Sequence, residues 1–310
     1  MPKICYQPKQ FSADRLKLIE TCDLICQDYA SQGYDLTLRQ LYYQCVSKDL
    51  LPNKPEEYKK LGDLIADARL AGLINWSHIV DRTRNVMGNE HWERPSQLIE
   101  QAAKTYTIDK WAEQDDYVMV WIEKQALEGV IQGMCSQLDV PFFCCRGYVS
   151  LSEMWSAGQR LLTKIEQGKR VHIIHLGDHD PSGIDMSRDI KARLNMFVGA
   201  HTQGQEVEVH VLRAALNMPQ IERLNPPPNP AKVSDSRARA YIEKYGDSSW
   251  ELDALSPLEL NGVIERAVGM FRDEGKWGES KKLEARGRKT LEVIHQEFES
   301  VVKFLRGDVI

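Results

Sequence analysis

Between residues 115 and 216 the sequence alternates short apolar runs with helix-like segments, and this alternation restricts the fold more than any other feature. The apolar runs are "DYVMVWIE", "VPFFCCRG", "RVHIIHLGD" and "EVEVHVLRAAL". Runs that are apolar at nearly every position are typical of strands buried on both faces, with the intervening helices as cover. The sequence therefore predicts an α/β fold with a parallel sheet in this region.

The flanking sequence predicts two further domains. Residues 1–110 contain amphipathic segments, among them "LTLRQLYYQCVSKDL", followed by short extended pieces in "LINWSHIVDRTRNV". Helices followed by a β-ribbon are the pattern of a winged helix, a helix-turn-helix variant that binds DNA. After residue 216, "NPPPNPAK" breaks regular structure. We expect a winged-helix-like DNA-binding domain at 1–110, a metal-binding α/β core at 111–216, and a helical C-terminal extension packed on the core at 217–310.

Composition limits the classes of function. The chain has 310 residues and a formal net charge of −5, which argues against binding nucleic acid through bulk positive charge but allows a local basic groove. No apolar run approaches the roughly 20 residues that span a bilayer. The first residues, "MPKICYQPKQ", have no apolar core of a signal peptide. We expect a cytoplasmic protein without membrane contact.

Acidic residues follow the first and third predicted strands. Glu123 ends the first strand, and Asp178 and Asp180 follow the third. Because first and third strands can lie side by side in a sheet with right-handed crossovers, these three carboxylates can converge. Hard oxygen ligands of this kind suit Mg²⁺, with Mn²⁺ as a substitute. The alternative is that the acidic residues are solvated or cap helices, and Asp185 fits that alternative well.

The same residues carry a family resemblance. Glu123 together with "GDHDPSG" resembles the TOPRIM fold of type IA and type II topoisomerases, primases and some nucleases. The form "DHDPSGID" is most similar to the A subunit of the type IIB topoisomerase (topoisomerase VI) and to its relative, the meiotic double-strand-break transesterase. Ser182 stands where that family usually has Tyr. The resemblance covers roughly residues 35–215.

A second motif lies in the N-terminal half. The segment "LRQLYYQ" is similar to the Arg-Asp-Ile-Tyr-Tyr segment that carries the cleaving tyrosine of that family. The resemblance makes Tyr43 the nucleophile and places Arg39 near it to orient a phosphate; Gln40 replaces the acidic residue. The alternative is a packing role for Tyr43. Tyr43 lies off the apolar stripe of this segment, so we expect it to be exposed.

The resemblance implies Mg²⁺-dependent DNA cleavage, in which Tyr43 attacks a backbone phosphate and Glu123 holds metal or transfers a proton. It also implies a homodimer, since tyrosine and metal site come from different subunits in the related enzymes. The sequence has no phosphate-cradling glycine-rich loop, so use of ATP would need a separate ATPase subunit. Two alternatives stay open: a TOPRIM hydrolytic nuclease that uses metal-activated water, and a non-catalytic DNA-binding protein.

Basic and acidic residues outside these motifs give weaker hypotheses. Arg82 and Arg84 lie where a wing would contact DNA phosphates. We expect the basic residues of the third helical segment (Lys59, Lys60 and Arg69) to form a solvated face. Glu251 and Asp253 either add to the metal site or pair with Arg237, and the sequence favours neither.

Overall fold

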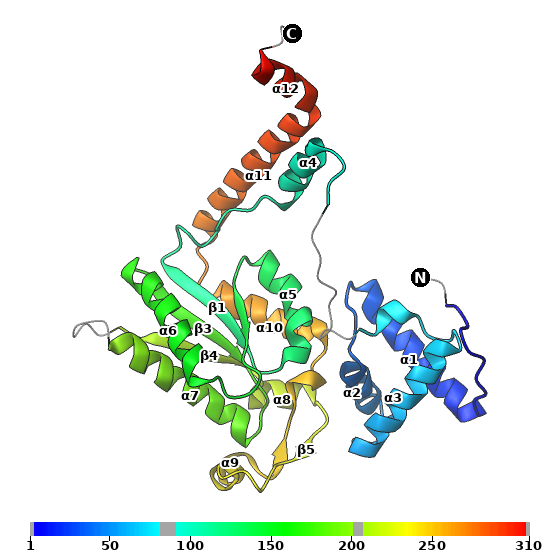
Figure 1. Cartoon of the computed structure of the whole chain (residues 1–310). Helices are drawn as coiled ribbons and strands as arrows, with labels where there is room; N and C mark the ends of the chain where they lie inside the picture. The colour runs from blue at the N-terminus through cyan, green and yellow to red at the C-terminus, as the bar shows by residue number, and fades with distance from the viewer. Residues whose placement is uncertain (1–2, 81–90, 201–206, 308–310) are drawn as a thin grey trace. The chain divides into compact units, whose positions relative to one another are not determined.

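A computed structural model describes residues 3–80, 91–200 and 207–307 (Figure 1). The chain forms two compact units, each assembled from segments far apart in the sequence. The first contains Met1–Arg84 and Val118–Met270, and the second contains Asn85–Tyr117 and Phe271–Ile310.

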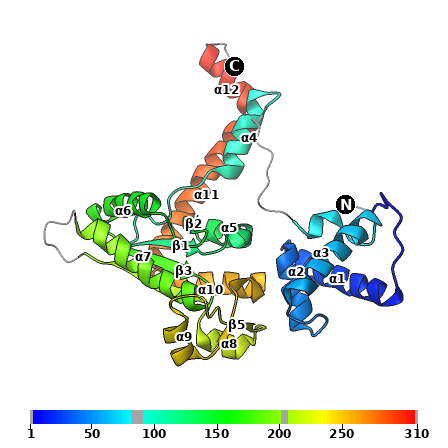
Figure 2. The ribbon, with the colours of Figure 1, turned by 60° about the horizontal axis from the view of Figure 1, so that its bottom comes forward.

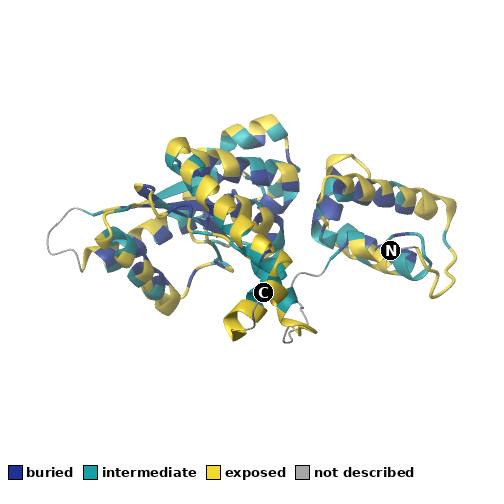
Figure 3. Cartoon of the chain, turned by 90° about the horizontal axis from the view of Figure 1, so that it is seen from above, coloured by how far each residue is buried: buried dark blue, intermediate teal, exposed yellow. Residues whose placement is uncertain are grey.

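The parallel α/β sheet predicted from the sequence is confirmed. Its strands lie in the order β2-β1-β3-β4. The first two pair in parallel with Val120 opposite Phe142, and the last two with Ile173 opposite Val211. The two central strands, β1 and β3, are buried along most of their length, whereas β2 and most of β4 are only partly buried (Figure 3). The strands are β1 (Asp116–Ile122), β2 (Phe142–Cys144), β3 (Arg170–Leu176) and β4 (Val209–Ala215).

Helices cover both faces of this sheet (Figures 1 and 2). The crossovers α6 (Leu151–Glu166) and α7 (Pro181–Gly199) pack against each other on one face. The crossover α5 (Glu128–Gln137), preceded by the 3₁₀ turn η2 (Gln125–Leu127), packs with α10 (Pro257–Gly269) on the other. Right-handed crossovers require this division, because the chain reverses its direction across the sheet between β2 and β3. The reversal makes the carboxyl ends of β1 and β3 a topological switch point, where ligands of such sheets bind.

The N-terminal segment forms three α-helices around their own apolar cluster. They are α1 (Ala13–Ser31), α2 (Leu38–Ser47) and α3 (Pro55–Leu70), and η1 (Trp76–His78) follows them. Leu41 and Cys45 of α2 are fully buried in this cluster. Within the described residues, the expected β-ribbon is reduced to one parallel bridge between Leu36 and Ile79. Residues 81–90 of that region lie outside the described residues, and the winged-helix assignment stays a prediction.

The segment after β4 departs from expectation at its proline-rich part. We expected no regular structure in "NPPPNPAK", but Asn229 and Pro230 pair antiparallel with Ser249 and Ser248. Proline is tolerated there because a two-residue edge strand does not need every backbone donor. The elements of this segment are α8 (Met218–Leu224), β5 (Asn229–Pro230), α9 (Ala238–Tyr245), β6 (Ser248–Ser249) and η3 (Leu252–Ala254).

The second unit pairs α4 (Pro95–Thr105) with the charged helix α11 (Glu274–Gln296). The predicted domain boundary at residue 110 assigns α4 to the N-terminal domain, whereas the compact unit joins it to the C-terminal segment. The helical C-terminal extension predicted from the sequence ends in two helices: α11 begins at Glu274, and near Glu297 it gives way to α12 (Phe298–Arg306).

A buried ion pair holds the second unit together. The Glu284 carboxylate lies 2.5 Å from Lys110 Nζ, and both side chains are only 11% exposed. The same carboxylate accepts hydrogen bonds from Thr107 Oγ1 at 2.8 Å and from the Ile108 amide at 3.2 Å. Burial acts to raise the pKa of Glu284, but Lys110 and these donors outweigh burial and lower it.

We expect Glu284→Gln to destabilise the second unit by about 3 kcal/mol near neutral pH, because it removes the carboxylate that lies 2.5 Å from the buried Lys110 ammonium. The folded-state pKa of Glu284 lies below its ordinary value of 4.5. Its contribution is therefore fully present above that value and is lost as pH falls through the folded pKa. The difference in stability between wild type and Glu284→Gln should therefore become smaller as pH falls. Amide hydrogen exchange of α4 and α11 in the whole chain measures this stability.

The matched control is Glu279→Gln on the same helix. Glu279 pairs with Lys282 at 2.7 Å, but both side chains are well exposed. Exposed pairs contribute little to stability. Equal exchange rates in the two variants would show that the Lys110–Glu284 pair does not stabilise this unit.

Candidate functional site

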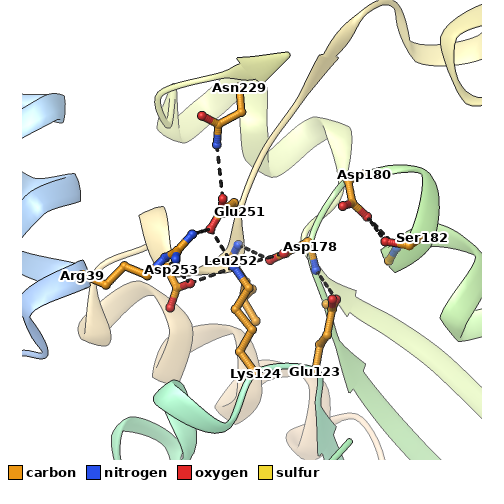
Figure 4. A network of polar contacts seen from close by, with 12 residues as sticks. Arg39, Glu123, Lys124, Asp178, Asp180, Ser182, Asn229, Glu251, Leu252 and Asp253 are labelled. Carbon is orange, nitrogen blue, oxygen red and sulfur yellow. Dashed lines mark hydrogen bonds and ion pairs between the residues drawn. The ribbon is translucent and has the colours of Figure 1, made fainter. Parts of the chain in front are cut away.

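The carboxyl ends of β1 and β3 bring two of the predicted acidic residues together (Figure 4). The Glu123 amide donates to the Leu176 carbonyl at 2.9 Å, which continues the pairing of β1 with β3. The Glu123 carboxylate Oε2 then accepts the Asp178 amide at 2.9 Å. Glu123 and Asp178 thus flank the switch point, as the strand order predicted from the sequence requires.

Asp180 begins helix α7. Its Oδ1 accepts the Gly183 amide at 2.6 Å and the Ser182 hydroxyl at 2.9 Å, so Asp180 is the N-cap of this helix. The alternative role as a helix cap therefore applies to Asp180. The cap uses one oxygen, and no hydrogen bond joins Oδ2 to any residue that the structure describes. Asp180 can serve as a cap and still offer an oxygen to a ligand.

Lys124 is a central residue of this site that the sequence analysis missed. Its Nζ lies 3.0 Å from Asp178 Oδ2, 2.8 Å from Glu251 Oε2 and 2.7 Å from Asp253 Oδ2. Burial acts to lower the pKa of Lys124, but the carboxylates outweigh burial and raise it, so the side chain stays an ammonium. The available signal was its position directly after the strand-end Glu123.

Glu251 and Asp253 belong to this cluster and do not pair with Arg237. Arg39 of α2 forms an ion pair with Glu251 Oε2, and its Nε lies 3.3 Å from Asp253 Oδ2 (Figure 4). Arg237 instead pairs with Asp185 at 2.9 Å and with Asp235 at 3.2 Å. The predicted alternative of a pair with Arg237 is therefore wrong, and both residues instead share Lys124 with Asp178. Their addition to a metal site stays a prediction.

Asp253 is an exceptionally buried member of the cluster. Its side chain is 1% exposed, and its Oδ1 has no hydrogen-bond partner among the described residues. Asp178 is held in place by the Leu252 amide, which donates to its Oδ1 at 2.7 Å. The segment Glu251–Asp253 thus supplies both charge and a positioning hydrogen bond to the end of β3.

Tyr43 is buried, so the expectation that it would be exposed is wrong. Its side chain belongs to the apolar cluster and the residue is 4% exposed. Its ring lies 5.4 Å from that of Tyr42, and the Arg39 guanidinium lies 5.8 Å from its centroid. Burial and then Glu251 raise the pKa of Tyr43, while a hydrogen bond with Asn229 and the charge of Arg39 lower it. Helical spacing misled because α2 is also covered on the side that faces residues 229–254.

Arg213 of β4 fixes the loop that carries the aspartates, and sequence analysis did not identify it. Its Nη2 donates to the carbonyls of Gly177 at 3.0 Å and Asp178 at 2.5 Å, and Nη1 donates to the Gly183 carbonyl at 2.8 Å. Gly183 also lies very close to this loop, since an added Cβ would be 2.2 Å from the Asp178 carbonyl oxygen. The positions of Asp178 and Asp180 are thus determined by a cation and by a close backbone approach.

Glu123 is a largely buried carboxylate with other carboxylates near it, and this environment raises its pKa. Burial and the neighbouring Asp178 and Asp180 carboxylates raise the pKa of Glu123 to about 7. Glu123 Oε1 and Asp180 Oδ2 have no hydrogen-bond partners among the described residues. Mg²⁺ commonly takes one or two protein carboxylates and keeps several waters, so Glu123 and Asp180 fit it. The described residues contain no cluster of three or more His, Cys, Asp or Glu side chains with metal-binding geometry.

The predicted DNA-contacting residues lie elsewhere. Arg82 and Arg84 fall outside the described residues, and their role stays a prediction. Lys59 and Lys60 are exposed, as expected of a solvated face. Arg69 is partly buried and donates to the carbonyls of Trp76 and Ile79, so the expectation of a solvated side chain is wrong for this residue.

Comparisons with known proteins give no family assignment. No protein-family model matches the chain, and no curated protein and no solved structure is significantly similar to it. Among the residues that the structure describes, no helix is both long enough and apolar enough to cross a membrane.

Proposed function

We propose that this chain is a Mg²⁺-dependent enzyme that cleaves the DNA backbone, with Tyr43 as the attacking group. The observation that carries the proposal is the arrangement of Glu123, Asp178 and Asp180 at the switch point between β1 and β3, where this type of sheet binds ligands. The Arg39–Glu251 ion pair supports it further, because it brings the helix that carries Tyr43 to the same acidic cluster.

Each residue has a distinct task in this mechanism. Glu123 and Asp180 hold the metal ion, which when bound neutralises charge on the phosphate and on the leaving oxygen. Asp178 and Lys124 keep the loop and the Glu251–Asp253 segment in position. Arg39 exchanges Glu251 for a DNA phosphate, which a guanidinium binds with two parallel hydrogen bonds. This exchange frees α2 from the acidic cluster, and the Tyr43 oxygen then attacks the phosphorus. A phosphotyrosyl bond forms as the bond from phosphorus to the leaving deoxyribose oxygen breaks, and that oxygen takes up a proton in place of the one that the phenol loses to solvent.

The partners of this enzyme follow from the resemblance to the topoisomerase VI A subunit. We propose DNA as substrate, Mg²⁺ or Mn²⁺ as cofactor, and a homodimer in which each subunit cuts one strand. In this proposal Tyr43 acts with the metal site of its own chain, which departs from the related enzymes, where the two come from different subunits. A rejoining cycle driven by ATP would require a separate ATPase subunit. Arg82 and Arg84 are the proposed phosphate contacts beyond the cleavage site.

The burial of Tyr43 favours a second candidate, a hydrolytic nuclease. A phenol that is 4% exposed and has a raised pKa is a poor nucleophile until its helix moves. In this alternative a metal-activated water would attack the phosphate, and Glu123 would accept or donate the proton. Tyr43 then only packs.

Replacement of Tyr43 by Phe separates these mechanisms. The variant removes the attacking oxygen and keeps the ring that packs against Tyr42. End-labelled duplex DNA is incubated with protein and Mg²⁺ or Mn²⁺, and the products are resolved before and after protease digestion. With the wild type, we expect label that enters the gel as cleaved DNA only after digestion. With Tyr43→Phe, we expect this product to disappear, because no phosphotyrosyl bond forms.

Tyr58→Phe is the matched control. Tyr58 also contacts Tyr42, edge to face with the ring centres 5.4 Å apart. It lies on α3, and among the described residues no hydrogen bond or ion pair joins it to the acidic cluster, so this variant should cleave like the wild type. Free cleaved ends from both wild type and Tyr43→Phe would replace the transesterase with the hydrolytic nuclease. Absence of cleavage by the wild type under all conditions would leave a DNA-binding protein without catalysis.

A further inference from the structure

A cavity of about 340 Å³ lies beside the start of α7 and against α9. Its walls are largely apolar and aromatic, with the rings of Tyr241 and Tyr245 on α9 facing Pro181 and Ile184 on α7. The two tyrosine rings lie 5.1 Å apart. This volume falls within the range of small-molecule pockets, which starts near 300 Å³.

The lining of this cavity carries an excess of positive charge. Arg188, Arg237 and Lys244 contribute to it, and Asp185 is its acidic member. Asp185 is already neutralised, because it lies 2.6 Å from Arg188 Nε and 2.9 Å from Arg237 Nε. Lys244 lies 4.9 Å from the centre of the Tyr245 ring, and no described carboxylate lies within ion-pair distance of it. The cavity therefore combines an aromatic interior with Lys244, which has no carboxylate partner among the described residues, and with two guanidinium groups that share the Asp185 carboxylate. Arg237 also pairs with Asp235 at 3.2 Å.

The cavity shares a wall with the loop of the candidate site. The Tyr241 hydroxyl lies 2.8 Å from His179 Nδ1 and 2.9 Å from the His179 carbonyl oxygen. His179 stands between Asp178 and Asp180 in the sequence, and its ring also contacts that of Tyr245 at 4.7 Å. A group bound in the cavity would thus lie next to the carboxylates proposed to hold the metal.

We propose that this cavity binds a nucleotide, with the base against the tyrosine rings and the phosphate at Arg188, Arg237 and Lys244. Flat bases stack on aromatic side chains with little regard to sequence, and guanidinium groups bind phosphate oxygens bidentately. The inference extends the proposed function: the nucleotide belongs to the strand that is cleaved and lies beside the scissile phosphate. It accounts for a local basic site on a chain whose net charge is −5.

The test is binding of fluorescein-labelled single-stranded DNA of about 12 nucleotides. Fluorescence anisotropy reports the binding, and EDTA is present so that no cleavage occurs. Tyr245→Leu removes the ring and should lower affinity about tenfold with an unchanged salt dependence. Arg237→Gln removes a phosphate contact and should lower both the affinity and the slope of log affinity against log salt. Unlabelled deoxynucleoside monophosphates are added as competitors, to distinguish a free nucleotide from one within a strand.

The matched control is Arg239→Gln on the same helix, since Arg239 is 91% exposed and does not line the cavity. It should bind DNA like the wild type, and thermal unfolding should show that all variants are folded. The inference is overturned if the wild type does not bind the DNA, or if both cavity variants bind as the wild type does. It is also overturned if Arg239→Gln weakens DNA binding as much as Arg237→Gln does.

The cleavage assay separates this inference from the proposed function. If the chain never cleaves DNA but the cavity variants bind DNA more weakly, the inference is upheld and the proposed catalysis is rejected. If the chain cleaves DNA but the cavity variants bind DNA as the wild type does, the proposed catalysis is upheld and the inference is rejected.

Discussion

Asp178→Asn combined with Asp180→Asn is expected to abolish metal-dependent DNA cleavage, with a loss of about a thousandfold or more. Asp180→Asn removes a charge proposed to hold the catalytic cation, and Asp178→Asn removes the charge that positions its loop. Together these losses forfeit several kcal/mol of transition-state stabilisation. The fold should survive, because Asn is as good an N-cap as Asp at position 180, and the carbonyl of Asn at 178 still accepts the Leu252 amide. Cleavage of labelled duplex DNA with increasing Mg²⁺ measures the loss.

The single variants sharpen this experiment. Asp180→Asn keeps the cap and loses only charge, whereas Asp178→Asn also points an amide donor at the Lys124 ammonium and should cost stability. The control is Asp189→Asn, which removes an aspartate of α7 that pairs with Arg193 outside the site. Metal-dependent cleavage that persists in the double variant would reject the TOPRIM assignment.

The second large effect concerns Lys124. We expect Lys124→Met to lower the free energy of unfolding by about 3 to 5 kcal/mol near neutral pH, because it removes the cation that Asp178, Glu251 and Asp253 share and leaves Arg39 to pair with the last two. Urea unfolding of the whole chain measures the change. Lys60→Met is the control, since Lys60 forms an exposed pair with Glu57 and its loss should matter little.

The effect of Lys124→Met should depend on pH and on metal. In the wild type the folded-state pKa of Glu251 is lowered, even though burial opposes the shift, so its contribution is lost as pH falls. In the variant the crowded carboxylates take up protons more readily in the folded state, so the variant gains stability as pH falls. The free energies of unfolding of wild type and variant should therefore converge at low pH. Mg²⁺ should stabilise the variant more than the wild type, because it supplies the missing positive charge. Equal stability of the two proteins throughout would reject this account.

The sequence sufficed for the sheet and for the residues at its edge. Continuous apolar runs separated by helices predict a parallel sheet, because each run and each helix can be identified from its own short segment of sequence. The neighbouring positions of Glu123 and Asp178 follow from the direction of crossovers alone. Asp180 was predicted in the correct place, but the sequence did not indicate that its carboxylate also caps α7.

The remaining site residues could not be predicted because their roles depend on contacts between distant segments. Lys124 and Glu251 are 127 residues apart, and Arg39 and Glu251 are 212 residues apart. Nothing in the local pattern of either segment encodes such a pairing. The burial of Tyr43 also depends on a contact between distant segments. Helical periodicity predicts one buried face of α2, but the segment near Asn229 buries a second face.

The pairing of α4 with α11 determines when each compact unit can form during synthesis. Residues 118–270 interrupt the second unit, so a ribosome releases α4 long before the helix that covers it exists. The first unit has by then been made completely, and it can fold before its neighbour. A chain that stops at residue 270 would contain α4 without α11, the helix that packs against it. A shortened chain should therefore either omit both parts of the second unit, residues 85–117 and 271–310, or retain both parts.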